Sequence, residues 1–148
     1  MQEVIASALI CLVVGVTDGD TLKARCGTPG SYQVVKVRIG AIDAPEKSQA
    51  FGTRSRQHLN ELCHLVQATI RKTDTDRYGR TVADVECRGQ DVATEQVKAG
   101  MAWVFDRYST GYEWLYRHQD AARNDGRGLW TDSEPVAPWE WRASRRKS

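Results

Sequence analysis

The sequence lacks the features that place a chain outside the ordinary globular class. No internal repeat or low-complexity segment interrupts its 148 residues, a length typical of one domain. The longest apolar stretch, Val4 to Val14, is about half of what a membrane-spanning helix requires. No positively charged segment precedes this stretch, so we interpret it as the first strand of a folded domain and not as a signal peptide.

A strong charge and the usual metal-binding patterns are also lacking. The net charge is only +2, which by itself does not indicate a nucleic-acid partner. The three histidines have no metal-ligand spacing and no CxxC pair is present, which argues against a zinc site. Basic residues gather only near the end, at Arg142, Arg145, Arg146 and Lys147. Such a tail is usually a solvated, frayed end, with weak attraction to a polyanion as the alternative.

Four cysteines are present: Cys11, Cys26, Cys63 and Cys87. The first two flank Asp18-Gly19, and Asp-Gly is among the strongest hairpin signals. A hairpin folded there places Cys11 opposite Cys26 within disulfide range, and a Cys63–Cys87 bridge follows by elimination. Two bridges imply an oxidising compartment, so we expect a secreted or periplasmic protein. The alternative is four buried free thiols in a cytosolic protein.

Hydrophobic patterning predicts five strands and three helices. The expected strands cover residues 10–16, 21–26, 32–39, 67–72 and 81–87. The expected helices cover residues 51–66, 91–100, with Asp91 as the N-cap, and 112–125. Five strands with a helix after the third suit a Greek-key barrel. We therefore expect an α+β fold, a five-stranded OB-fold β-barrel with three α-helices, in one domain that spans residues 1–148.

The aromatic residues are interpreted mainly as packing groups. Trp103, Trp114 and Trp130 are expected in the core, where tryptophan usually lies, and not as platforms for nucleic-acid bases. Pro135 and Pro138 predict an irregular basic tail over residues 131–148. Trp139 and Trp141 in that tail are expected to pack back on the body.

Three polar clusters interrupt the strand pattern, at residues 17–21, 38–46 and 76–80. Each cluster alone is explained by turn chemistry or a solvated loop. Together they supply carboxylates of the kind that hold a hard cation, and arginines whose planar guanidinium groups match phosphate oxygens. The carboxylates are Asp20, Asp43 and Glu46, and the arginines are Arg38 and Arg80. A cation, paired arginines and a spare carboxylate are the parts required for phosphodiester hydrolysis.

These clusters resemble the motifs of the staphylococcal nuclease family in order and spacing. The resemblance is carried by Val16–Leu22, Val37–Glu46 and Asp76–Arg80, and extends to Val97–Val104 and Gly126–Trp130. It covers roughly residues 10–131. The familiar member of the family lacks the four cysteines, so the resemblance points to a separate, disulfide-containing branch.

The resemblance implies a role for each matching residue. It implies that Asp20 and Asp43 bind Ca2+ through their carboxylates and that Ala44 binds it through the backbone carbonyl. The familiar member of the family has Thr where this chain has Ala44, a change that is tolerable where only the backbone carbonyl is a ligand. Glu46 is implied as the general base that acts on the attacking water. The loop that follows Glu46 is short, so we expect it to cover the site less.

The arginines and tyrosines receive implied roles in the same way. Arg38 and Arg80 are expected to bind the phosphate and stabilise the transition state. Arg77 and Tyr78 resemble residues that contact a neighbouring phosphate or nucleotide. Tyr108 lies where the match is loose, and we expect it to stack on a base.

The function implied by the resemblance is a calcium-dependent endonuclease that cuts DNA and RNA and leaves 3′-phosphate ends, with single strands preferred. We expect a monomer with no membrane partner. Oxygen ligands of this kind also hold Mg2+ or Mn2+. Two alternatives remain open. One is an OB-fold module that binds single-stranded nucleic acid without cutting it, and the other is a plain interaction domain.

Overall fold

A computed structural model describes residues 7–146. Residues 4–6 of the apolar stretch, and Lys147 in the basic tail, lie outside the described residues. Five strands form the body: β1 Ala8–Asp18, β2 Thr21–Cys26, β3 Gln33–Ile39, β5 Gln67–Thr75 and β6 Thr81–Cys87. They pair in the order β3-β2-β1-β5-β6, and a parallel pairing of β3 with β6 closes the barrel. The predicted five-stranded OB-type barrel and α+β class are confirmed.

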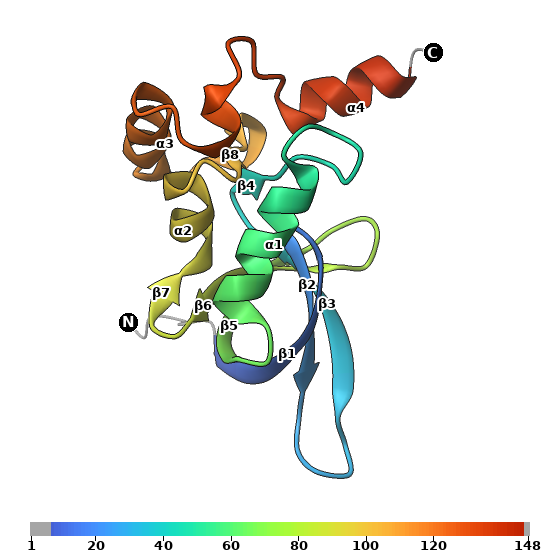
Figure 1. Ribbon diagram of the computed structural model, residues 1–148. Helices are drawn as coiled ribbons and strands as arrows, with labels where there is room; N and C mark the ends of the chain where they lie inside the picture. Colours follow the sequence, from blue (N-terminus) through green and yellow to red (C-terminus); the bar gives the residue numbers. More distant parts are fainter. Residues whose placement is uncertain (1–6, 147–148) are drawn as a thin grey trace.

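Shorter elements surround the barrel (Figure 1). Strand β4, Ile42–Asp43, pairs with β8, Trp103–Val104, and β7, Gln90–Asp91, pairs antiparallel with the end of β6. The α-helices are α1 Gly52–Cys63, α2 Val92–Lys98, α3 Leu115–Asn124 and α4 Pro138–Arg146, and the 3-10 helices are η1 Asp106–Tyr108 and η2 Gly128–Thr131. The first three α-helices match the prediction, and the Asp91 side chain accepts a hydrogen bond from Thr94 N at the start of α2, as expected of an N-cap. The fourth helix was not predicted.

The core fills the barrel and the space beneath α1. Val13, Leu22, Val37 and Ile39 from the first three strands are fully buried, together with Leu59 of α1. Burial of apolar surface on this scale is the main force that stabilises the fold. The barrel therefore gives the turns at its ends a rigid base.

The first hairpin forms with a turn one residue later than expected. Strand β1 ends at Asp18 and β2 begins at Thr21, so Gly19-Asp20 is the turn in place of Asp18-Gly19. Two irregularities in the β1–β2 pairing, which β-bulges produce, compensate for this shift further along. The Cys11–Cys26 disulfide forms as predicted, with Cα atoms 4.6 Å apart.

The second disulfide, between Cys63 and Cys87, links the last residue of α1 to the last residue of β6. Both cysteines are buried, so the bridge fixes the helix on the barrel. The predicted pairing is confirmed, and the alternative of four free thiols is wrong. The two disulfides indicate an oxidising, non-cytoplasmic compartment.

The structure corrects two predictions, one in the C-terminal segment and one at Trp114. Residues Pro138–Arg146 form helix α4 and not an irregular tail. Proline is favoured at the first helical position, and the acidic first turn and basic last turn of α4 complement the helix dipole. Trp139 packs on the body as expected, against Trp103 and Phe105. Trp114 was expected in the core but is 43% exposed, because it precedes α3 on the outer surface.

Figure 1 shows α4 near the β4–β8 end of the molecule, whereas the β2–β3 hairpin extends in the opposite direction. Within residues 7–146, no helix is long and apolar enough to cross a membrane.

Candidate active site

The turn between β1 and β2 carries the first carboxylate of the site. Asp20 is 7% exposed, and its Oδ2 accepts a hydrogen bond from Ala44 N at 2.8 Å. A side chain at Gly19 would put its Cβ 1.8 Å from Ser55 Oγ and 2.9 Å from the Ala44 Cβ. The turn can therefore approach α1 and the chain after β4 only because residue 19 is glycine.

The turn between β3 and β4 brings the second carboxylate to the same place. Ala41 adopts a left-handed conformation with φ of 69°, which is uncommon for a residue with a side chain. This turn reverses the chain so that Asp43 lies near Arg38. Asp43 is 1% exposed, and its backbone lies opposite Trp103 in the β4–β8 pairing.

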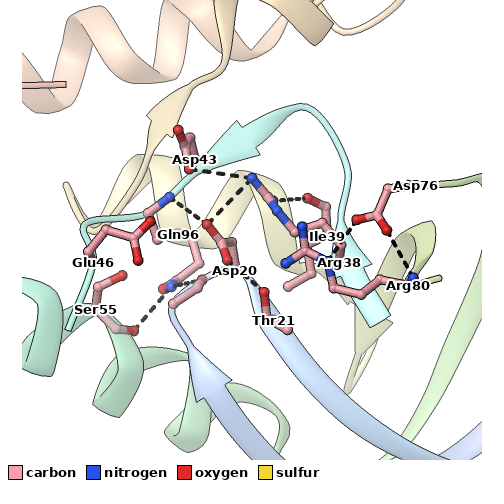
Figure 2. A network of polar contacts seen from close by, with 12 residues as sticks. Asp20, Thr21, Arg38, Ile39, Asp43, Glu46, Ser55, Asp76, Arg80 and Gln96 are labelled. Atoms are coloured by element: carbon pink, nitrogen blue, oxygen red, sulfur yellow. Dashed lines mark hydrogen bonds and ion pairs between the residues drawn. The ribbon is translucent and has the colours of Figure 1, made fainter. Parts of the chain in front are cut away.

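Arg38 lies between the two buried carboxylates (Figure 2). Its Nη2 is 3.4 Å from Asp43 Oδ1 and 3.5 Å from Asp20 Oδ2, and its Nη1 donates to Ile39 O at 2.7 Å. Glu46 follows β4 at the more open side of this group, with 36% of its side chain exposed. The structure therefore brings Asp20, Arg38, Asp43, Ala44 and Glu46 together.

A layer of buried polar groups, which sequence reasoning missed, supports the carboxylates. Gln96 of α2 is fully buried and donates from Nε2 to Gly19 O at 2.7 Å and to Ser55 O at 3.2 Å. Its Oε1 contacts Nδ1 of His58. Ser55 donates to Met101 O at 2.6 Å, and Thr21 donates to Asp20 Oδ1 at 2.8 Å. Groups that hold a functional residue in place in this way determine its geometry as much as the residue itself does.

The loop between β5 and β6 holds Arg80 at the margin of this group. Asp76 accepts hydrogen bonds from the backbone N–H groups of Tyr78 and Arg80, both at 2.9 Å, and from Arg80 Nε at 2.7 Å. Arg80 directly precedes β6, whose residue Val82 pairs with Arg38 of β3. In Figure 2 the Arg80 side chain points toward Arg38. The loop therefore directs a second guanidinium toward the group around Arg38.

The tyrosines expected to contact a nucleotide lie on the surface. Tyr78 is 69% exposed, with the guanidinium groups of Arg77 and Arg80 within 4.9 and 5.6 Å of its ring centre. Tyr108 is 56% exposed and packs edge-on against Phe105 at 4.9 Å. Both side chains are more than half exposed, although Arg107 also lies over the Tyr108 ring, 5.5 Å from its centre.

Arg142, in helix α4, makes a contact that the sequence did not predict. Its Nη1 donates to Glu46 Oε1 at 2.8 Å and to Asp43 Oδ1 at 3.1 Å, and its Nη2 donates to Asp43 Oδ2 at 2.7 Å. We expected this residue in a solvated tail, but only 30% of its side chain is exposed. No local pattern reveals the contact, because Arg142 and Asp43 are 99 residues apart.

Burial and crowding of carboxylates set the electrostatics of the site. Burial raises the pKa of Asp43 to about 6, and the Asp20 charge acts in the same direction, while Arg142 and Arg38 oppose the shift. Burial also raises the pKa of Asp18, with the charges of Asp20 and Glu46 adding to the effect. Asp18 therefore belongs to the same electrostatic group, although the sequence placed it only in a turn. The crowding of carboxylates at this site favours the binding of a cation there.

The donor chemistry fits a hard divalent cation. Asp20 and Asp43 offer carboxylate oxygens and Ala44 a backbone carbonyl, and Ca2+ takes ligands of these kinds, completed by water. Among residues 7–146 no group of three or more His, Cys, Asp or Glu side chains is arranged so that it could hold a metal ion.

Comparison with known proteins identifies the family. Residues 36–132 match the family model described as staphylococcal nuclease homologue. This range contains Arg38, Asp43, Glu46 and Arg80 but ends before α4 begins.

Three relatives illustrate the similarity. An "Uncharacterized endonuclease" of Haemophilus influenzae is 42% identical over 92% of this chain and 74% of its own length. An "Uncharacterized endonuclease" of Escherichia coli O157:H7 is 40% identical over 88% of this chain and 82% of its own length. A "Micrococcal nuclease" of Shigella flexneri is 34% identical over 92% of this chain and 82% of its own length. The family model and these relatives agree with one another and with the observed barrel. The chain therefore belongs to the staphylococcal nuclease family.

Proposed function

We propose that this nuclease is a secreted or periplasmic, calcium-dependent endonuclease that hydrolyses DNA and RNA and prefers single strands. The observation that carries the proposal is the group formed by Asp20 and Asp43 around Arg38, with Glu46 linked to Asp43 through Arg142 and Arg80 pointing toward the group from the next loop. Phosphodiester hydrolysis requires cationic groups and carboxylates held in fixed positions, and this end of the barrel supplies both. The names of the relatives, endonuclease and micrococcal nuclease, agree with this activity.

The side chains divide the work as follows. Arg38 and Arg80 bind the non-bridging oxygens of the phosphate and stabilise the charge that develops there. A divalent cation held by Asp20, Asp43 and the Ala44 carbonyl would polarise the phosphoryl group. Glu46 accepts a proton from the attacking water, and its partial exposure allows water to reach it.

The products follow from the bond that breaks. Water attacks phosphorus, Glu46 takes the water proton, and the bond from phosphorus to the 5′ oxygen breaks. The leaving 5′ oxygen gains a proton, so one fragment ends in a 3′-phosphate and the other in a 5′-hydroxyl. Arg77, Tyr78 and Tyr108 contact the neighbouring nucleotides, by charge and by stacking on the exposed rings. The protein acts as a monomer.

The test is digestion of single-stranded DNA with Ca2+ and with a chelator, by the parent protein and Glu46→Gln. Cleavage by the parent should require Ca2+. The variant should lose at least about 100-fold in rate, the usual contribution of a general base, and keep its DNA affinity. Glu61→Gln, an exposed site on α1, is the matched control and should behave as the parent. Extension of the fragments by terminal transferase only after phosphatase treatment would identify 3′-phosphate ends.

Two outcomes would contradict the proposal. Equal losses of rate and DNA affinity in Glu46→Gln would exclude its role as the base. Binding of DNA without cleavage under any divalent ion would favour the binding module that the fold also permits.

A further inference from the structure

The C-terminal helix is attached to the candidate active site by two independent contacts. The first is aromatic: the Trp139 ring stacks on Phe105 at 5.1 Å and meets Trp103 edge-on at 5.7 Å. The second is ionic, between Arg142 and the carboxylates of Asp43 and Glu46. Trp139 and Arg142 are three residues apart, so they lie on the same face of α4.

Arg142 uses the carboxylate atoms that the proposed metal site needs. Both oxygens of Asp43 accept hydrogen bonds from its guanidinium, at 3.1 and 2.7 Å. Glu46 Oε1 accepts a third, at 2.8 Å. A cation that coordinates Asp43 would lie against this guanidinium, and two like charges at such a distance repel each other strongly in a partly buried site. The arginine and the metal ion therefore compete for one carboxylate.

The position of α4 in the chain makes it separable from the catalytic barrel. The match to the family model ends at residue 132, and α4 begins at Pro138. The aromatic contact attaches the helix through β8 and the residue that follows it, without using any carboxylate. Loss of the ionic contact would therefore release the Arg142 side chain while Trp139 still holds the helix.

We propose that Arg142 is a built-in competitor of the catalytic metal, an internal cation whose side chain covers Asp43 and Glu46 until a divalent ion displaces it. The inference rests on the proposed function, since it assumes that Asp43 binds the ion. Displacement also frees Glu46 from its ion pair, which leaves its carboxylate available to water. Metal binding and opening of the ionic contact are thus linked, and the linkage is reciprocal.

The test measures Ca2+ binding directly, without any substrate. Calorimetric titration with Ca2+ is carried out on the parent, Arg142→Gln and Arg142→Lys. Arg146→Gln, which removes the same charge from an exposed position of the same helix, is the matched control. Removal of the competitor should tighten Ca2+ binding by about 5-fold or more, the lower end of usual coupling between sites. Arg142→Lys should fall between parent and Arg142→Gln, because an ammonium group lacks the planar fork.

A second measurement stays interpretable even for a variant that is less stable than the parent. The rise in melting temperature caused by a fixed excess of Ca2+ reports affinity for the folded state only. This rise should be larger for Arg142→Gln than for the parent and unchanged for Arg146→Gln.

The outcomes separate the inference from the proposed function. Tighter binding by Arg142→Gln, including binding that appears only in this variant, supports the competitor role. Equal or weaker binding by Arg142→Gln, with clear binding by the parent, overturns the inference and leaves the metal site intact. Equally tight binding by both Arg142→Gln and Arg146→Gln would reduce the effect to overall charge and also overturns it. No binding by any of the proteins overturns the proposed metal site and the inference with it.

Discussion

The two halves of the candidate active site are built in opposite ways. The carboxylate half is buried and assembled from distant parts of the chain: Ala44 N donates to Asp20, 24 residues away, and Gln96 donates to Gly19 O, 77 residues away. The loop half, residues 76–80, is closed by contacts within four residues and carries a tyrosine that is 69% exposed. One half depends on the whole fold, and the other depends mainly on itself.

This difference indicates how each half can change. A substitution in the carboxylate half disturbs packing and chemistry together, because its polar groups are buried and share partners. A substitution in the loop half can alter contacts with the substrate while the barrel remains intact. The proposed metal site should therefore be sensitive to mutation, and the proposed nucleotide contacts more tolerant.

The largest effect is expected for Gly19→Ala in the carboxylate half. The new Cβ would lie 1.8 Å from Ser55 Oγ, so the β1–β2 turn must move away from α1. We expect the free energy of unfolding to fall by about 1–3 kcal/mol, and nuclease activity to fall with it as Asp20 shifts. Urea denaturation measures the change. Gly15→Ala, in the strand β1 that leads to this turn, is the control, since no atom outside its chain neighbours lies within 4 Å of its added Cβ. Equal stability of the two variants would show that the turn is less tightly packed than described.

A smaller effect is expected for Asp76→Asn in the loop half. Although burial acts to raise the pKa of Asp76, hydrogen bonds from Arg80 and Tyr78 lower it below its ordinary value. The ionised carboxylate therefore stabilises the fold above the ordinary pKa of 3.8, and this contribution disappears as pH falls through the lower folded-state pKa. Stability should fall by about 1 kcal/mol or less at neutral pH, as is usual for exposed ion pairs.

Urea denaturation of the parent and Asp76→Asn at several pH values checks this sign. Asp120→Asn, which removes an exposed carboxylate from α3, is the control and should leave the parent's stability unchanged at neutral pH. A difference between parent and Asp76→Asn that grows toward acid pH would contradict the assigned direction. The cleavage rate of Asp76→Asn should fall by more than its loss of unfolding free energy accounts for, because Arg80 loses the carboxylate that orients it.

The smallest effect on stability is expected for Tyr78→Ala. The ring is exposed, so the free energy of unfolding should change by no more than about 0.5 kcal/mol. Affinity for single-stranded DNA should weaken by about 1–3 kcal/mol if a base stacks on this ring. Fluorescence anisotropy with a labelled oligonucleotide measures the loss. Tyr32→Ala, an exposed tyrosine in the loop of the β2–β3 hairpin, is the control, and equal losses in both variants would exclude a specific stacking role.

Much of this fold could be predicted from the sequence because its signals are local. Apolar and β-branched residues around turn signals indicated the first two barrel strands, partial period-two alternation indicated the third, and Asp91 marked the start of α2. The Cys11–Cys26 pairing was predicted from a turn placed one residue too early. It proved right because irregularities in the hairpin restored the register. The disulfide was therefore predicted correctly, although the position of the turn was not.

The missed residues have in common that only the tertiary fold gives them a role. Gln96 reads as an ordinary helix position, and nothing near it in sequence reveals that it contacts Gly19. Arg142 reads as part of a basic tail, because the carboxylates that neutralise it come from strand β4 and the chain that follows. The roles of Asp20, Asp43 and Glu46 remain predictions that the geometry supports, since their chemistry is tested only by the experiments above.

The ionic contact of α4 differs from the disulfides in when it can form. The disulfides join residues 15 and 24 apart, whereas Arg142 and Asp43 are 99 apart. A chain that emerges from a ribosome or an export channel folds from its N-terminal side, so the barrel strands and all four cysteines are available before α4 is. Asp20, Asp43 and Glu46 are therefore available before Arg142 is. In a newly made molecule, this order would let the proposed divalent ion reach Asp43 before Arg142, its proposed competitor, can bind there.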